Sequence, residues 1–346
     1  MIDLRSDTGT LPSSAMRQAM MNAELGDDGR TGEDGKGEDP TVVRLERTAA
    51  TLLGKEDALF CPSGTMANVI AVLSFTKRGD LVALDRKSHL IVSEKSLFSP
   101  DLFGRTAVAI ETNKTGVPNL DFLERLFKQQ DVKLLCLENT NGYYGGNCLT
   151  VSQVNEICML ADRFQIPIHL DGARMWNAAV SLQCEASDLA RPTDTVMFCL
   201  SKGLGAPVGS LLCGTKERIR EARVLRKAIG GTMRQAGIMA AAGLVALENV
   251  DALREDHEKT TRFVQLLKPH PLFSVQSYPH PTNMVHMRIM DTKMNSEAVA
   301  HILKQKGLLV KAMSSDRLRL VFHQDISWRE VEQAADIMNS SILTMK

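Results

Sequence analysis

The stretch "IPIHLDGAR" (residues 166–174) decides the fold class of this chain. It opens with a short apolar run that leads to the carboxylate of Asp171, and it follows a segment at 151–164 with the apolar spacing of a helix. An apolar strand directly after an amphipathic helix is typical of a parallel sheet whose two faces are covered by helices. Ligands of such sheets gather at the carboxyl ends of the strands, which is where Asp171 stands.

The same alternation continues on both sides of this stretch. Expected strands lie at 58–61, 81–84, 106–110, 133–137, 166–170, 195–200 and 209–213, and expected helices at 11–25, 42–53, 66–75, 120–129 and 151–164. The sequence therefore predicts an α/β fold in which residues 1–254 form a large domain with a mostly parallel sheet covered by helices.

A different pattern begins at about residue 255. Expected helices at 259–267, 297–306 and 328–342 are mixed with expected strands at 273–275, 284–287, 308–311 and 317–322. We expect residues 255–346 to form a small C-terminal α+β domain.

The bulk composition argues against two kinds of partner. Lys and Arg number 41, as do Asp and Glu, so the formal net charge at pH 7 is zero and binding of nucleic acid or membrane through bulk charge is not expected. The seven cysteines show no zinc spacing, so no metal is expected and buried reduced thiols are the interpretation. The first residues carry no apolar region of a signal peptide, and a cytoplasmic location is expected.

Ser63, Gly64 and Thr65 lie between an expected strand and an expected helix. A helix start offers free backbone N–H groups and the positive end of a dipole, which together favour an anion such as phosphate. The alternative is an ordinary helix cap by a hydroxyl side chain.

Two charged side chains follow apolar strands and complete a possible ligand site. Asp171 is a candidate because an unpaired buried carboxylate is costly, although a salt bridge to Arg174 is the alternative. Lys202 is followed by Gly203 and Gly205, and burial there would favour a neutral, nucleophilic amine; an ordinary surface lysine is the alternative.

Together these residues match the needs of pyridoxal 5'-phosphate. Lys202 would form the Schiff base, Asp171 would keep the pyridine nitrogen protonated, and the helix start at 63–65 would hold the phosphate. His89, after another strand, could stack on the ring or move protons, and a satisfied loop histidine is its alternative. A dinucleotide site is disfavoured, because the glycines at 203–209 fit the fingerprint with one residue too many and 209–213 is expected to be a strand.

Six motifs, in order along nearly the whole chain, resemble the threonine aldolase family. They are "IDLRSDT" (2–8), "FCPSGTMAN" (60–68), "HLDGARMWNAA" (169–179), "CLSKGLGAPVGSLLCG" (199–214), "GGTMRQAGIMAAAG" (230–243) and "RLVFHQDIS" (319–327). Members of this family are pyridoxal-phosphate enzymes of the aspartate aminotransferase fold type I. The resemblance implies a homotetramer, a dimer of dimers, with active sites at the dimer interfaces.

The resemblance also implies roles for single residues. Lys202 and Asp171 keep the roles given above, Arg174 contacts the ring hydroxyl, Gly64 and Thr65 hold the phosphate, and His89 stacks on the ring. Ser6 and Arg319 bind the substrate carboxylate, and Arg234 lies near the phosphate, in one interpretation across the subunit interface.

The implied reaction is retro-aldol cleavage of a β-hydroxy-α-amino acid, such as L-threonine or L-allo-threonine, to glycine and an aldehyde. One departure concerns the substrate side: typical members have Asn-Thr-His where this chain has Asn139-Thr140-Asn141, and an amide cannot act as a base. His89 or a water is then the expected base. Altered bond selectivity, in an amino-acid racemase or a β-eliminating lyase, is the alternative, and a non-catalytic protein is disfavoured by Lys202.

The second departure is the stretch "GDDGRTGEDGKGEDP" (26–40), where typical members have a shorter segment with a tyrosine. A calcium loop is disfavoured because Gly29 and Thr31 occupy two ligand positions. Six acids argue against a phosphate loop, and a mobile solvated loop is plausible. We expect the extra residues, 29–36, to lie near the mouth of the pocket and to tune substrate choice.

Overall fold

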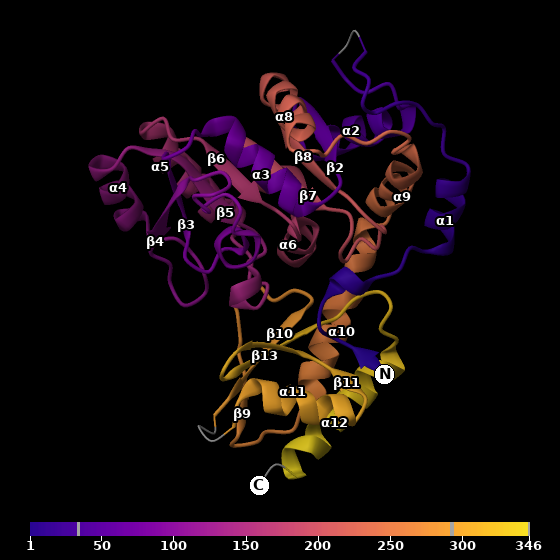
Figure 1. Cartoon of the computed structure of the whole chain (residues 1–346). Coiled ribbons are helices and arrows are strands. Elements are labelled where there is room, and N and C mark those ends of the chain that lie inside the picture. The colour runs from indigo at the N-terminus through magenta and orange to yellow at the C-terminus, as the bar shows by residue number, and fades with distance from the viewer. Residues whose placement is uncertain (33–34, 291–293, 345–346) are drawn as a thin grey trace.

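The computed structural model describes residues 1–32, 35–290 and 294–344. Its larger sheet has seven strands in the order β2-β8-β7-β6-β5-β3-β4 (Figure 1). They span β2 (Asp57–Cys61), β3 (Leu81–Asp85), β4 (Thr106–Ile110), β5 (Val132–Glu138), β6 (Ile168–Asp171), β7 (Thr195–Cys199) and β8 (Ser210–Gly214). Strands β3 to β7 are mutually parallel, and β8 is antiparallel to both of its neighbours, so the expected mostly parallel sheet is confirmed.

Helices cover both faces of this sheet. One face packs on α2 (Pro40–Leu53), α4 (Leu120–Gln129), α5 (Val151–Arg163), α6 (Met175–Leu182), α7 (Ala186–Ala190) and α9 (Gly237–Glu248), and the other on α3 (Gly64–Phe75) and α8 (Lys216–Ala228). Alternation along β6 sends Ile168 and Leu170 into the first core. His169 and Asp171 consequently point toward α3.

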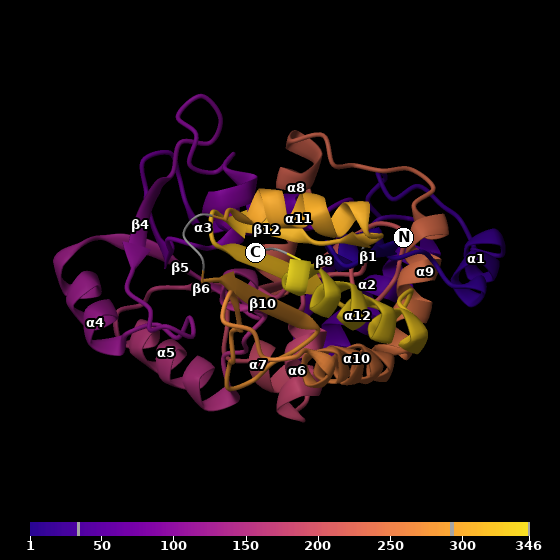
Figure 2. The same ribbon diagram turned by 90° about the horizontal axis from the view of Figure 1, so that it is seen from below.

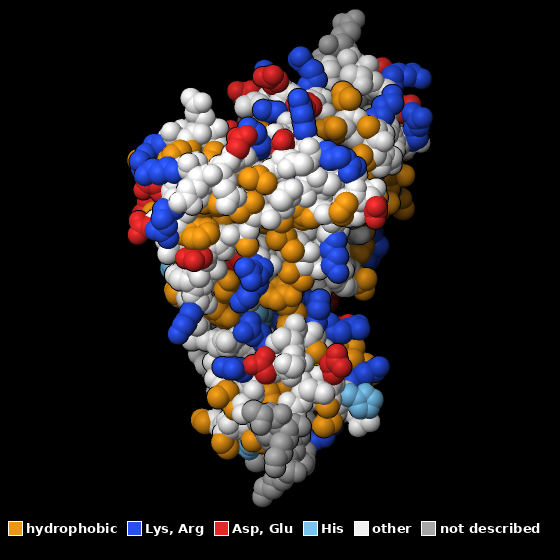
Figure 3. Space-filling model, turned by 60° about the vertical axis from the view of Figure 1, so that its left-hand side comes forward, with side chains coloured by type: hydrophobic (Ala, Val, Ile, Leu, Met, Phe, Trp, Pro, Cys, Tyr) orange, Lys and Arg blue, Asp and Glu red, His pale blue; other side chains and the backbone are white. Residues whose placement is uncertain are grey.

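The C-terminal elements form a second sheet with its own core. Its antiparallel order is β12-β13-β10-β9, from β9 (Phe273–Val275), β10 (Met284–Ile289), β12 (Lys311–Ser314) and β13 (Arg317–Val321). Helices α10 (Leu253–Leu266), α11 (Ser296–Gln305) and α12 (Trp328–Thr344) pack against it, as Figure 2 shows from below. Figure 3 shows Lys and Arg side chains around the narrowing between this part and the larger one.

The N-terminus belongs to this second core rather than to the larger one. β1 (Ile2–Asp3) pairs in parallel with β11 (Leu308–Leu309), so the N-terminus lies beside the C-terminal elements (Figure 1). Ile2 and Leu4 are buried among the C-terminal side chains. A short apolar segment at the start of a chain has no local signal for its partner, because that partner lies 306 positions further on.

Several boundaries differ from the sequence-based expectations. α1 covers only Ser14–Met21 of the expected 11–25, because Ser13 caps its start and the helix ends at Asn22. The expected strand 308–311 is two strands, since β11 pairs with β1 and β12 with β13. Helices α6, α7, α8 and α9 were not expected. Among the described residues, none of the helices is both long and apolar enough to cross a membrane.

The interpretation of the cysteines as buried free thiols is confirmed for six of them. Cys184 is the exception, since it is only partly buried.

Candidate active site

A cavity of about 340 Å³ lies at the carboxyl ends of β6 and β7. Six residues that the sequence singled out line it together: Ser63, Gly64, Thr65, His89, Asp171 and Lys202. The parallel strands explain this meeting, because their carboxyl ends share one edge of the sheet. Residues that are far apart along the chain therefore face one small volume.

The start of α3 forms one wall of the cavity. Ser63 caps the helix, since its Oγ accepts a hydrogen bond from the Met66 N–H at 3.2 Å. The first intrahelical bond runs from Ala67 N to Ser63 O, so the N–H groups of Gly64 and Thr65 precede it and are available to an anion. A side chain at 64 would place its Cβ 2.8 Å from the Cys199 Sγ, so glycine permits the close approach of α3 to β7.

Asp171 lies at the floor of the cavity with 2% of its surface exposed. Its Oδ1 accepts a hydrogen bond from the Ala173 N–H at 3.1 Å, and its Oδ2 accepts one from Asn68 Nδ2 at 3.0 Å. The alternative of a salt bridge between Asp171 and Arg174 is wrong, because Arg174 pairs with Asp7.

Arg174 donates two hydrogen bonds to the carboxylate of Asp7. Its Nε and Nη2 donate to the two carboxylate oxygens at 2.7 and 2.5 Å. Burial alone would raise the pKa of Asp7, but the charge and hydrogen bonds of Arg174, aided by Lys202, hold it well below its ordinary value. Sequence reasoning missed Asp7 as a site residue, although it stands in the quoted motif "IDLRSDT".

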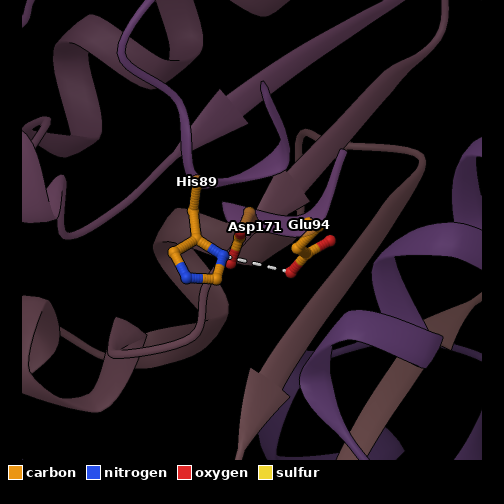
Figure 4. Close-up of side chains that lie close together, drawn as sticks. All are labelled: His89, Glu94 and Asp171. Carbon is orange, nitrogen blue, oxygen red and sulfur yellow. Dashed lines mark hydrogen bonds and ion pairs between the residues drawn. The ribbon is translucent and has the colours of Figure 1, made fainter. Parts of the chain in front are cut away.

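His89 lies beside two carboxylates (Figure 4). One polar atom each from His89, Glu94 and Asp171 lies within 4.8 Å of the others, and His89 Nδ1 is 3.1 Å from Glu94 Oε1. The bond to Glu94 raises the pKa of His89 against the opposing effect of burial, and the charge of Asp171 adds to the rise. Glu94 was not anticipated from the sequence.

Glu138, at the end of β5, joins two loops of the site. Its carboxylate accepts hydrogen bonds from the N–H groups of His89 and Gly142, both at 3.0 Å. Burial and the nearby charge of Asp171 raise the pKa of Glu138 to about 7. Sequence reasoning assigned no role to this carboxyl group.

Lys202 follows β7 in a turn held by its backbone. Its carbonyl accepts bonds from the Thr10 hydroxyl and the Gly205 N–H, both at 2.8 Å. The turn needs a left-handed residue at 205, where φ is 77°, and leads into the antiparallel strand β8. A strand rather than a helix follows the glycines, so the dinucleotide alternative is wrong.

Three proposed substrate residues lie outside the lining of this cavity. Asn141 Oδ1 caps a short helix by accepting the Tyr143 N–H at 3.0 Å, and the Ser6 hydroxyl accepts the Thr8 N–H at 3.3 Å. Arg319 is 8% exposed and donates to the Arg5 carbonyl at 3.0 Å. Burial and the charge of Arg174 lower the pKa of Arg319 to about 10.

Neither Arg234 nor the described residues of the stretch 26–40 line the cavity of their own chain. Arg234 pairs with Asp27 at 3.1 Å on the surface. Asp39 caps α2 and also accepts the Gly237 N–H at 2.9 Å, which ties this part of the stretch to α2 and α9. Residues 33 and 34 lie outside the described residues, and the expected place at the pocket mouth stays a prediction.

Two further ion pairs fix the same stretch. Asp28 pairs with Arg226 at 2.8 Å, and Lys36 pairs with Asp57. The expectation of a mobile solvated loop is wrong for Asp28, which is 2% exposed.

The residues of the cavity fit pyridoxal phosphate. An amine suits its aldehyde, a buried carboxylate suits its ring nitrogen, and the N–H groups of a helix start suit its phosphate. The fold and the site define a pyridoxal-phosphate-dependent enzyme of fold type I.

Comparison with known proteins narrows this class. The beta-eliminating lyase family matches residues 3–290. Low-specificity L-threonine aldolase 1 of Arabidopsis thaliana is 37% identical, covering 100% of this chain and 97% of that protein, and the low specificity L-threonine aldolase of Escherichia coli is 38% identical over 97% of both. The chain belongs to the beta-eliminating lyase family and, within it, to the threonine aldolases.

Solved structures show the same fold. A putative aromatic amino acid beta-eliminating lyase/threonine aldolase from Exiguobacterium superimposes with a TM-score of 0.81 at 20% identity, covering 99% of this chain and 97% of that one. A putative L-allo-threonine aldolase from Listeria monocytogenes gives 0.77 at 22% identity, covering 98% and 96%.

Proposed function

We propose that this chain cleaves the Cα–Cβ bond of a β-hydroxy-α-amino acid of the threonine type, giving glycine and an aldehyde. The observation that carries the proposal is the meeting of Lys202, Asp171 and the start of α3 in one cavity. The threonine aldolases that resemble this chain over its full length support the choice of substrate.

Bound pyridoxal phosphate supplies an acceptor for the electron pair that the broken Cα–Cβ bond leaves on Cα. Lys202 would hold it covalently through its amine, and the Asp171 carboxylate would keep a proton at its ring nitrogen. Arg319 fixes the substrate α-carboxylate as a two-pronged donor, with the Ser6 hydroxyl beside it.

His89 accepts the proton of the substrate β-hydroxyl, which becomes the carbonyl of the aldehyde, and a proton returned to Cα completes glycine. Asn141 does not replace an imidazole here, since its side-chain oxygen is engaged by the Tyr143 N–H and an amide does not titrate near neutral pH.

The test uses the purified protein with L-threonine and with L-allo-threonine. The expected result is glycine and acetaldehyde in equal amounts, together with the visible absorbance of a lysine-bound cofactor. Lys202→Ala should lose both. A colourless protein that forms no borohydride-stable adduct at Lys202 would overturn the cofactor assignment. Exchange of the α-proton without aldehyde would indicate a racemase, and a keto acid with ammonia an eliminating lyase.

The proposal extends to assembly and location: a homotetramer in the cytoplasm with each site at a dimer interface. The surface position of Arg234, away from its own cavity, supports a contribution to a partner's site. Light scattering should give four chains per particle. Mixing Lys202→Ala chains with Arg234→Ala chains should restore part of the activity, because one hybrid site is then intact. Cell fractionation checks the location.

A further inference from the structure

Asn68 lines the cavity and donates hydrogen bonds to two carboxylates there. It stands on α3 with 1% of its surface exposed. Its Nδ2 donates to Asp171 Oδ2 at 3.0 Å and to Glu94 Oε1 at 3.1 Å. An amide nitrogen has two protons, so each carboxylate receives one of them.

The third bond of Asn68 fixes which way its amide points. Asn68 Oδ1 faces His169 Nε2 at 3.0 Å, and His169 Nδ1 faces the Thr195 hydroxyl at 2.9 Å. A carbonyl oxygen only accepts, so His169 carries its proton on Nε2 and takes the threonine proton on Nδ1. Burial lowers the pKa of His169 to about 4, which agrees with a neutral ring. If the amide were flipped, its oxygen would face the carboxylate oxygens of Asp171 and Glu94, and no hydrogen bond could form between these acceptors.

Glu94 extends the same network to His89. Its side chain is 3% exposed, and the single oxygen Oε1 accepts from both Asn68 and His89. Figure 4 shows the bond between Glu94 and His89. An ionised carboxylate has no proton to give, so the proton on that side of His89 belongs to Nδ1. The Nε2 of a neutral His89 is then the free proton acceptor.

We infer that Asn68 and Glu94 are positioning residues. Glu94 keeps the imidazole proton of His89 on Nδ1. Asn68 holds the Asp171 carboxylate in place by a hydrogen bond and connects it to Glu94. The inference rests on the proposed function for its catalytic consequence. A carboxylate–imidazole pair of this kind orients a base without touching the substrate. The network thus sets the proton arrangement at His89 and the position of the Asp171 carboxylate.

The first test is Glu94→Gln, which keeps the size of the side chain and removes its charge. The acid limb of kcat/KM for L-threonine should move to lower pH, because the anion that raises the pKa of His89 is gone. Asp171 and Glu138 also face His89 and remain in place, so the shift reports Glu94 alone. An unchanged limb would overturn the role of Glu94.

A matched control is Glu124→Gln on α4, where the carboxylate pairs on the surface with Lys128 and Arg163. It should leave the acid limb where it is. An equal shift in this variant would show that the effect is general and would overturn the assignment.

The second test measures binding of pyridoxal phosphate to protein freed of cofactor, followed by absorbance. Asn68→Ser should weaken binding by roughly tenfold, as expected for the loss of a hydrogen bond to a charged group. Because Asn68 donates directly to Glu94 Oε1, the double variant Asn68→Ser/Glu94→Gln should bind no more weakly than the worse single variant. Additive losses would contradict the network.

The pH profile and the cofactor affinity distinguish a failure of the proposed reaction from a failure of the hydrogen-bond network. If no amino acid is cleaved but cofactor affinity still falls in a non-additive way, the network stands and the proposed reaction fails. If threonine is cleaved and both variants behave like the unchanged protein, the network fails alone. Thermal unfolding confirms that each variant is folded.

Discussion

Arg174 donates two hydrogen bonds to Asp7, a residue 167 positions earlier in the chain. The pair joins the segment that follows β1, which packs with the C-terminal sheet, to the loop after β6 of the larger sheet. Asp7 is fully buried, and Asn283 Nδ2 also approaches it, at 3.4 Å. The ion pair and the Asn283 contact together therefore link three distant segments at Asp7.

The Asp7–Arg174 pair should be costly to break. Asp7→Asn removes the charge and leaves the Arg174 guanidinium buried without its carboxylate, so the free energy of unfolding should fall by about 3–5 kcal/mol. Urea denaturation measures the change. The control Asp3→Asn breaks the exposed pair with Arg5 and should cost no more than about 1 kcal/mol. Equal losses in the two variants would contradict the structural role of Asp7.

Asp256 should make stability depend on pH. Burial raises its pKa from 3.8 to about 7, against the opposing charge of Lys259 and with the support of Asp7, Glu255 and Asp325. The folded state then holds a proton that the unfolded state releases, so stability is lost as pH rises from about 4 to about 7.

Asp256→Asn should remove this loss. The variant should exceed the unchanged protein by roughly 2–4 kcal/mol in unfolding free energy at pH 8 and show little advantage at pH 4. Urea denaturation across this range gives the difference. Asp251→Asn, an exposed acid nearby, is the control; the same pH-dependent gain there would rule out burial as the cause.

Arg319 should govern substrate binding more than turnover. Arg319→Lys keeps a positive charge but loses the two-pronged geometry, so KM for L-threonine should rise roughly 10- to 100-fold. The visible absorbance of the cofactor should stay, since Arg319 lies outside the lining of the cavity. An unchanged KM would place the α-carboxylate elsewhere.

The extra residues 29–36 should influence substrate choice through the assembled protein. Replacing them with Val-Tyr should change the ratio of kcat/KM for L-threonine and L-allo-threonine. Lys36→Gln weakens the anchor at Asp57 and keeps the loop length, and it serves as the control. If the replacement leaves the ratio unchanged, the stretch is only a spacer.

The sequence by itself determined the sheet with helices on both faces and the reactive side chains that follow its strands. Apolar runs such as 166–170 and 195–200 bury themselves wherever the chain folds, and each is followed by the residue that the site uses, Asp171 or Lys202. Strand ends in a parallel sheet meet by geometry, so a local pattern was enough to bring Ser63, His89, Asp171 and Lys202 together.

Only the tertiary structure decided which side chains form hydrogen bonds with one another around the cavity. Asp7 accepts hydrogen bonds from Arg174, and Asn68 donates to both Glu94 and Asp171. These side chains are distant along the chain and come within hydrogen-bonding distance only after packing. A hydrogen bond requires about 3 Å between its atoms, and no local spacing encodes that distance across such separations. For the same reason the sequence did not reveal that β1 pairs with β11, or that the described part of the stretch 26–40 is held at α2 and α9. Packing sets these partners rather than periodicity.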